Sequence, residues 1–193
     1  VRSVVRSYVL KRKVERRYAR YVNWNGLVDA DPALCAHDLW VLYVGDSQRA
    51  SMMPVGGNRF YYFFGAPMPA GTQVEPSEIR SELSTLFAGW PTAVQNLIQT
   101  LDPAATNRLE ICDMDPIEQM VRGRVALLGD AAHATTPTLG QGGCQAIEDA
   151  EVLTRYLVST TISVTDALQR YEQARKERTA QLVLKARKRT GLI

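Results

Sequence analysis

One segment, residues 124–157, constrains the fold of this 193-residue chain more than any other. A short apolar run, Arg124–Leu128, leads into Gly129-Asp130, and a loop with one proline and three glycines follows. Apolar residues at helical spacing then extend over residues 145–157. The order strand, glycine-rich loop, helix is typical of a phosphate or cofactor site, because the free N–H groups and positive dipole end of the helix point at the ligand.

The residue types in this segment favour a cofactor over a simple helix cap. Asp130 would follow a buried strand, where a carboxylate can accept hydrogen bonds from sugar-like hydroxyls. Glycines permit close backbone approach and positive φ. A capping loop explains glycines alone, but not the whole spaced set. The candidate cofactor-binding residues in this segment are Gly129, Asp130, Pro137, Gly140, Gln141, Gly142 and Gly143.

This segment resembles the GD motif of the group A flavin monooxygenases, the family of the para-hydroxybenzoate and salicylate hydroxylases. Ser3 and Arg6 are in register with the end of that family's DGxxSxxR motif. The resemblance implies FAD as the cofactor, with Asp130 binding the ribityl hydroxyls. It also implies that residues 140–144, which include Cys144 as a further cofactor-binding residue, lie along the flavin, where their N–H groups stabilise the anionic reduced ring. Pro137 is implied to shape the wall near the reactive face of the ring.

A closer similarity covers nearly the whole chain. Five stretches resemble the bacterial FAD-dependent urate hydroxylases of purine catabolism: residues 18–28, 53–55, 59–61, 101–103 and 184–189. This resemblance implies hydroxylation of urate to 5-hydroxyisourate, with O2 as oxidant and NADH (or NADPH) as reductant. It places Asn23, Arg49 and Tyr61 on a sheet that faces the substrate. These types suit a planar anion rich in N–H and C=O groups, because arginine offers a fork of donors and asparagine both donates and accepts.

Each of these side chains also has a plainer interpretation. An arginine on a strand is often solvated or salt-bridged, Tyr61 lies in an aromatic run typical of a core, and Asn23 could pair with a sheet edge. Thr138 stands where we expect an acid in a urate hydroxylase, so a salicylate-like or other aromatic hydroxylase remains an alternative. For His133 we favour a structural hydrogen bond over a catalytic role.

The fold class predicted is α+β / α/β: an antiparallel substrate sheet with helices, joined to the C-terminal part of a Rossmann-like FAD-binding domain. Residues 1–17 are interpreted as a remnant of the FAD domain, 18–112 as the substrate-binding part, and 113–193 as the second FAD-binding segment with a long helix. Expected strands are Arg20–Val28, Leu39–Val44, Gln48–Val55, Arg59–Phe64 and Leu109–Cys112, and expected helices begin near Glu78, at Thr92 and near Thr165.

The GxGxxG pattern that binds the FAD diphosphate in this family is absent from the sequence. If Gly140 is aligned with the first glycine of this pattern, Gln145 occupies the position of the last glycine. We therefore expect the chain to be the C-terminal half of such an enzyme, cut short near residues 191–193, and to bind FAD weakly by itself. A non-catalytic module is an alternative. Missing partner strands would expose apolar surface, which predicts self-association or a complementary N-terminal segment.

Composition excludes other classes of protein. The three cysteines are odd in number, far apart and outside any CxxC pair, which indicates free thiols in a cytoplasmic protein, and no metal site is expected. No apolar stretch is long enough for a membrane span. The net charge is +3, and the basic tail after Thr165 carries an apolar stripe, so an amphipathic helix is favoured over nucleic-acid binding. The expected stripe is Ala167, Leu168, Tyr171 and Ala174.

Overall fold

The computed structural model describes residues 3–159 and 161–190. It divides into two compact units, one made of residues up to Ala19 with those from Cys112 onward, and one made of Arg20–Ile111. The sequence predicts domain boundaries after residues 17 and 112, and these units divide after residues 19 and 111. Residues 1 and 2, which belong to the DGxxSxxR match, and the chain end at residues 191–193 lie outside the described residues.

The central unit is built on a five-stranded sheet with the order β2-β3-β4-β1-β5. The paired strands described are antiparallel, which confirms the predicted sheet. β2 begins two residues later than expected, because the Leu39 N–H donates to Ala36 in a turn and is not available to the ladder. The strands are β1 (Arg17–Asp29), β2 (Val41–Val44), β3 (Arg49–Pro54), β4 (Arg59–Pro67) and β5 (Asn107–Asp113).

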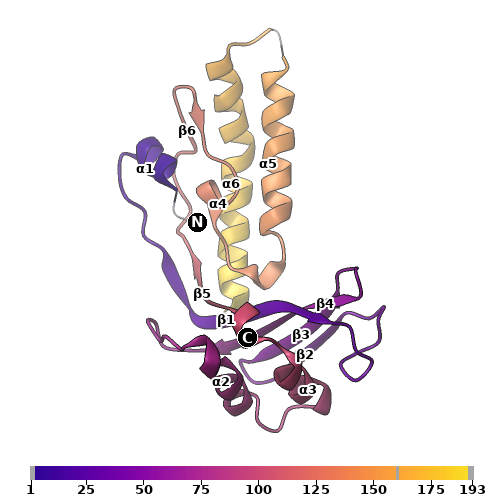
Figure 1. The fold of residues 1–193 in the computed structure, drawn as a ribbon. Coiled ribbons are helices and arrows are strands. Elements are labelled where there is room, and N and C mark those ends of the chain that lie inside the picture. The colour runs from indigo at the N-terminus through magenta and orange to yellow at the C-terminus, as the bar shows by residue number, and fades with distance from the viewer. Residues whose placement is uncertain (1–2, 160, 191–193) are drawn as a thin grey trace. The chain divides into compact units, whose positions relative to one another are not determined.

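Alternation along these strands gives the sheet two different faces. One face presents Trp24, Met52, Phe60, Tyr62 and Phe64 to a core that is closed by helices (Figure 1). The helical elements of this unit are η1 (Pro76–Glu78), α2 (Ile79–Leu86), α3 (Thr92–Thr100) and η2 (Pro103–Ala105). The other face carries the predicted substrate residues.

The second unit is mainly helical, with α5 and α6 lying side by side (Figure 1). Its core gathers Val9, Met114, Met120, Leu127 and Tyr171 from segments far apart in the sequence. The elements are α1 (Val4–Leu10), β6 (Val121–Arg122), β7 (Val125–Ala126), α4 (Asp130–His133), η3 (Pro137–Leu139), α5 (Gly142–Leu157) and α6 (Val164–Thr190).

Two details of this unit differ from the sequence predictions. The strand expected over Arg124–Leu128 is only the two-residue β7, because positive φ at Gly123 turns the chain into a hairpin and the carbonyl of Leu128 is taken into the turn before α4. On α6, Ala174 is exposed and Arg175 is buried in its place. The buried row continues through Thr179, Val183 and Ala186 at steps of three or four residues.

Within residues 3–159 and 161–190, no helix combines the length and apolar character that crossing a bilayer requires. The same residues contain no group of three or more histidine, cysteine or acidic side chains that could hold a metal ion. The three cysteines are free thiols.

Candidate functional site

Asp130 opens the short helix α4 and points an unengaged carboxylate outward. Its side chain is exposed and makes no hydrogen bond or ion pair within the described residues. The preceding Gly129 has φ 52°, and a Cβ added there would lie 3.2 Å from the Cβ of Ala146, so this position requires glycine. α4 has only four residues, too few to be stable alone, so its neighbours must fix its position.

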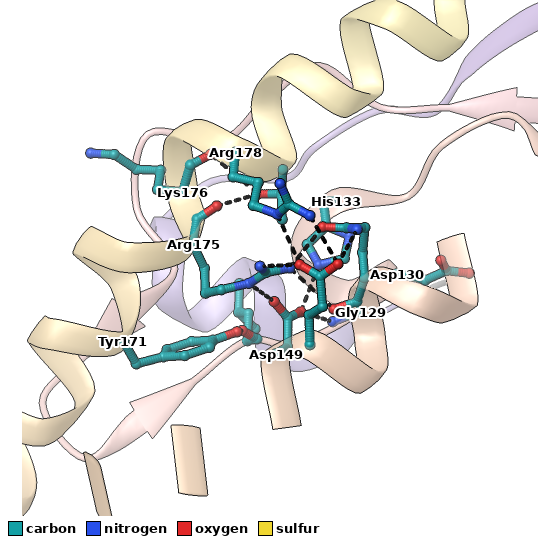
Figure 2. Close-up of polar contacts among 12 residues, drawn as sticks. Gly129, Asp130, His133, Asp149, Tyr171, Arg175, Lys176 and Arg178 are labelled. Carbon is teal, nitrogen blue, oxygen red and sulfur yellow. Dashed lines mark hydrogen bonds and ion pairs between the residues drawn. The ribbon is translucent and has the colours of Figure 1, made fainter. Parts of the chain in front are cut away.

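A buried carboxylate on α5 holds both ends of α4 (Figure 2). Asp149 is fully buried, and its Oδ2 accepts from the Gly129 N–H at 2.8 Å and lies 2.6 Å from His133 Nε2. Burial by itself would raise the pKa of Asp149, but the donors His133, Gly129 and Arg175 together keep it below its ordinary value. Asp149 is therefore an anion whose hydrogen bonds fix the turn that carries Asp130.

Arg175 of α6 supplies the counter-ion for this buried carboxylate. Its Nε donates to Asp149 Oδ1 at 2.7 Å, and its other nitrogens donate to Glu148 at 2.7 Å and to the side-chain oxygen of Gln145 at 2.8 Å (Figure 2). Arg178 binds Glu148 from the exposed side at 2.8 Å. Hydrogen bonds from Arg178 and Arg175 lower the pKa of Glu148 to about 2. Sequence reasoning placed Arg175 in a solvated tail; only its spacing of four residues after the buried Tyr171 could have indicated burial.

Arg6 holds α4 from the other side. Its side chain is buried, with Nε donating to the carbonyl of Ala131 and a terminal nitrogen donating to the carbonyl of Asp130, both at 2.7 Å. The Oγ of Ser3 accepts from the N–H of Arg6 and caps α1. Arg6 of the DGxxSxxR match thus contacts the backbone of Asp130, and Ser3 caps the helix that carries Arg6. No local sequence pattern shows this contact.

The glycine loop ends in unsatisfied N–H groups. Its first intrahelical hydrogen bond in α5 runs from the N–H of Gln145 to the carbonyl of Gln141, at 3.0 Å. The N–H groups of Gly142, Gly143 and Cys144 therefore have no intrahelical acceptor. No heavy atom lies within 4 Å of a Cβ added at Gly143, so this backbone borders open space. The exposed Pro137 begins η3, and Gly140 follows it with φ 64°.

Thr138 faces the C-terminal end of α6. Its hydroxyl lies 2.6 Å from that of Thr136 and 2.8 Å from that of Thr190, and it donates to the carbonyl of Ala186 at 3.1 Å. The position where an acid was expected thus holds a neutral hydroxyl that is occupied with protein partners.

The predicted substrate residues share the sheet face opposite the helices. Asn23 on β1 and Arg49 on β3 are both paired with Gly65 on the intervening β4, and directly paired residues point to the same face. Tyr61 lies four residues before Gly65 on β4, so it shares that face. The strand pairing places Asn23 and Arg49 on either side of Gly65. Tyr61 lies on the same face further along β4, outside the helix-covered core to which Phe60, Tyr62 and Phe64 belong.

Arg49 is a cation without a counter-ion in the part of the chain that the structure describes. Its guanidinium carbon lies 5.8 Å from the centroid of the Tyr21 ring, and it crosses over Gly65, which has no side chain to obstruct it. Asn23 is buried and accepts from the side-chain amide of Asn25 at 2.8 Å. Burial raises the pKa of Tyr61, so its hydroxyl stays protonated at neutral pH.

Comparison with known proteins identifies the family. Residues 1–186 match a family model described as an FAD binding domain. The chain belongs to this family. It is 53% identical over 190 residues to the FAD-dependent urate hydroxylase of Klebsiella pneumoniae subsp. pneumoniae, covering 98% of this chain and 49% of the relative. It is 54% identical over 187 residues to the FAD-dependent urate hydroxylase of Mycolicibacterium vanbaalenii, covering 97% of this chain and 47% of the relative.

A solved structure shows the same fold. Klebsiella pneumoniae HpxO complexed with FAD and uric acid superposes with a TM-score of 0.94 at 53% identity, over 97% of this chain and 48% of that one. These matches confirm the predicted family and fold class. The chain spans about half the length of the curated relatives it matches.

Proposed function

We propose that this chain supplies the substrate face and the flavin-side segment of an FAD-dependent monooxygenase that hydroxylates urate to 5-hydroxyisourate. The observation that carries the proposal is the unengaged Asp130 carboxylate, held rigidly in the same unit as the unsatisfied N-terminus of α5. The similarity to urate hydroxylases supports the choice of urate as the substrate.

The described groups fit the flavin end of FAD. Asp130 accepts hydrogen bonds from the ribityl hydroxyls, and the N–H groups of Gly142, Gly143 and Cys144 favour negative charge on the edge of the ring. The open space over Gly143 leaves room for a flat ring system. FAD, reduced by NADH or NADPH, supplies the activation of O2 and the oxygen transfer, which is chemistry that no side chain provides.

On the substrate face, the chain's own residues bind and orient urate. Arg49 pairs with the negative charge and a carbonyl of the substrate, as a planar fork of donors does. Asn23 donates its amide N–H groups, because its carbonyl oxygen is already engaged by Asn25. Tyr61 donates a hydrogen bond from its protonated hydroxyl and contacts the substrate ring.

A salicylate-like or other aromatic substrate is the second candidate. The observation that favours this candidate is the neutral side chain of Thr138. A neutral threonine at this position removes a charge that would help to select urate. The test is turnover by the protein extended N-terminally with a βαβ unit that carries GxGxxG, with urate, salicylate and related aromatics as substrates. We expect urate to be consumed in step with NADH. NADH oxidation that yields only hydrogen peroxide would show that urate is an effector, and the proposal would fail.

We also propose that this chain associates with itself or with a complementary segment in the cytoplasm. The support is the edge strand β2, where Leu42 and Val44 are exposed and which the exposed Trp40 immediately precedes. An exposed apolar edge is a template for pairing with another strand. Light scattering tests this: a monomer with a cooperative melt would contradict it.

A further inference from the structure

Tyr21 carries a buried polar group for which the fold provides no partner. The residue is 7% exposed, and its buried hydroxyl has no acceptor for its proton among the residues that the structure describes. Leaving a buried hydroxyl unpaired costs stability, and native proteins keep few such groups. A group of this kind calls for an explanation, and one explanation is a ligand that pairs with it.

The position of Tyr21 connects it to the proposed substrate residues. It lies two residues before Asn23 on β1, so both side chains point to the same face of the sheet. The Arg49 guanidinium lies against its ring, and both side chains approach Gly65. Burial raises the pKa of Tyr21, and the positive charge and N–H donors of Arg49 only partly oppose that rise. The hydroxyl is therefore protonated at neutral pH and available as a donor.

Two polar groups without a matching partner thus lie side by side on one face of the sheet. Arg49 has a positive charge without a carboxylate partner in the described part of the chain, and Tyr21 has a proton without an acceptor. A neutral ligand atom would satisfy the hydroxyl alone. An acceptor that carries negative charge satisfies both groups, because hydrogen bonds to charged partners are the stronger kind.

We propose that Tyr21 is a substrate-binding residue, whose hydroxyl donates to the same negatively charged edge of the substrate that Arg49 binds. The inference rests on the proposed function and deepens it. The substrate class that it defines is a planar anion with two neighbouring acceptor atoms on one edge. Such an anion places one acceptor at the guanidinium and the other at the hydroxyl.

The chain offers a matched control on the opposite face. The hydroxyl of Tyr62 is also buried, but it lies 2.7 Å from the Oγ1 of Thr106 and is therefore paired within the fold. Removing the two hydroxyls should have opposite consequences. Loss of the Tyr62 hydroxyl removes a hydrogen bond within the fold. Loss of the Tyr21 hydroxyl removes a donor that has no acceptor in the described fold and that we assign to the substrate.

The experiment compares Tyr21→Phe and Tyr62→Phe in the N-terminally extended, FAD-loaded protein. For Tyr21→Phe we expect the KM for urate to rise about five- to tenfold, with kcat within about twofold and the Tm without urate unchanged or higher. For Tyr62→Phe we expect a lower Tm and an unchanged KM. An unchanged KM in Tyr21→Phe, with urate turned over by the wild type, overturns this inference alone. Absence of both urate binding and turnover in the wild type overturns the proposed function together with it.

Discussion

At the scale of single residues, the position of Asp130 depends on one buried carboxylate in α5. Asp149 receives hydrogen bonds from a backbone N–H, a histidine and an arginine, so its charge is compensated although it is fully buried. A buried anion with fewer donors would be costly. The same hydrogen bonds fix a four-residue helix that has no stability of its own.

The stability of the folded chain at acid pH should depend on the carboxylate of Glu148, which precedes Asp149. Its pKa of about 2 in the folded state lies below the ordinary 4.5, so its contribution is present above about pH 4.5 and is lost as the pH falls towards 2. Because the side chain is 37% exposed, we expect roughly 1 kcal/mol or less after solvent screening. Thermal melts between neutral pH and acid should therefore show a shallower acid decline for Glu148→Gln than for the wild type.

The control for this measurement is Glu151→Gln on the same helix, since the ion-pair partner of Glu151 among the described residues is the exposed Arg155. Its acid decline should follow that of the wild type. A Glu148→Gln decline parallel to the wild-type curve would show that the charges of Arg175 and Arg178 do not stabilise the fold through Glu148.

Substitution of Gly143 should affect helix stability and FAD binding differently. Alanine at this helical position should leave stability unchanged or raise it by about 0.5–1 kcal/mol. Its methyl group would enter the open space that we assign to the flavin, so FAD affinity should fall by about tenfold or more. Gly142→Ala is the comparison, because its methyl group would meet Thr135 at 3.6 Å and not open space. Equal FAD affinity in Gly143→Ala and the wild type would place the flavin elsewhere.

The residues that form this site differ in how far the sequence can predict them. Asp130 and its glycines can be recognised because backbone geometry and ligand contact are encoded within one short segment. Arg175 cannot, because its partner Asp149 is 26 residues away and the burial of a guanidinium depends on that partner. Tyr21 is equally hidden, since an absent hydrogen bond becomes visible only in the folded structure.

At the scale of elements, α6 is part of the proposed cofactor site although it contributes no cofactor contact. Its guanidinium at Arg175 compensates Asp149, which in turn holds α4. Two basic residues of this helix therefore differ in kind. Arg178 is exposed to solvent, whereas Arg175 is buried and structural.

Replacing these two arginines should distinguish the two kinds. Arg175→Met leaves a buried carboxylate uncompensated, which costs roughly 3–5 kcal/mol and lowers the Tm of a chain of this size by about 6–20 °C. FAD binding should weaken as well, because α4 loses its support. Arg178→Met removes an exposed partner and should cost less than about 1 kcal/mol. Calorimetry and FAD titration of both variants check this; similar losses in the two would contradict the distinction.

The elements themselves were predicted well where local chemistry defines them. α3 begins and ends where expected, because Pro91 precedes it and the Asp102-Pro103 pair follows it closely. The alternating strands are recovered for the same reason. α1 and α4 were not predicted: both are short, and contacts of Arg6 and Asp149 with distant parts of the chain hold them in place.

At the scale of the whole molecule, the two units each have their own core. One presents a polar row on a sheet, and the other presents a carboxylate and a helix N-terminus. The chain covers about half of its relatives' length, and its 193 residues contain no GxGxxG pattern for a diphosphate. We therefore assign the ribityl and ring contacts of FAD to this chain, and the diphosphate contacts to residues that are not among these 193.

The most direct test is a titration of FAD followed by flavin fluorescence. It compares this chain, the protein extended N-terminally by a βαβ unit, and the extended protein carrying Asp130→Ala. We predict tight binding only for the extended wild type, with the Asp130→Ala variant weaker by about tenfold or more because the ribityl hydroxyls lose a charged acceptor. Tight binding by this chain alone, or wild-type affinity in the Asp130→Ala variant, would contradict the account.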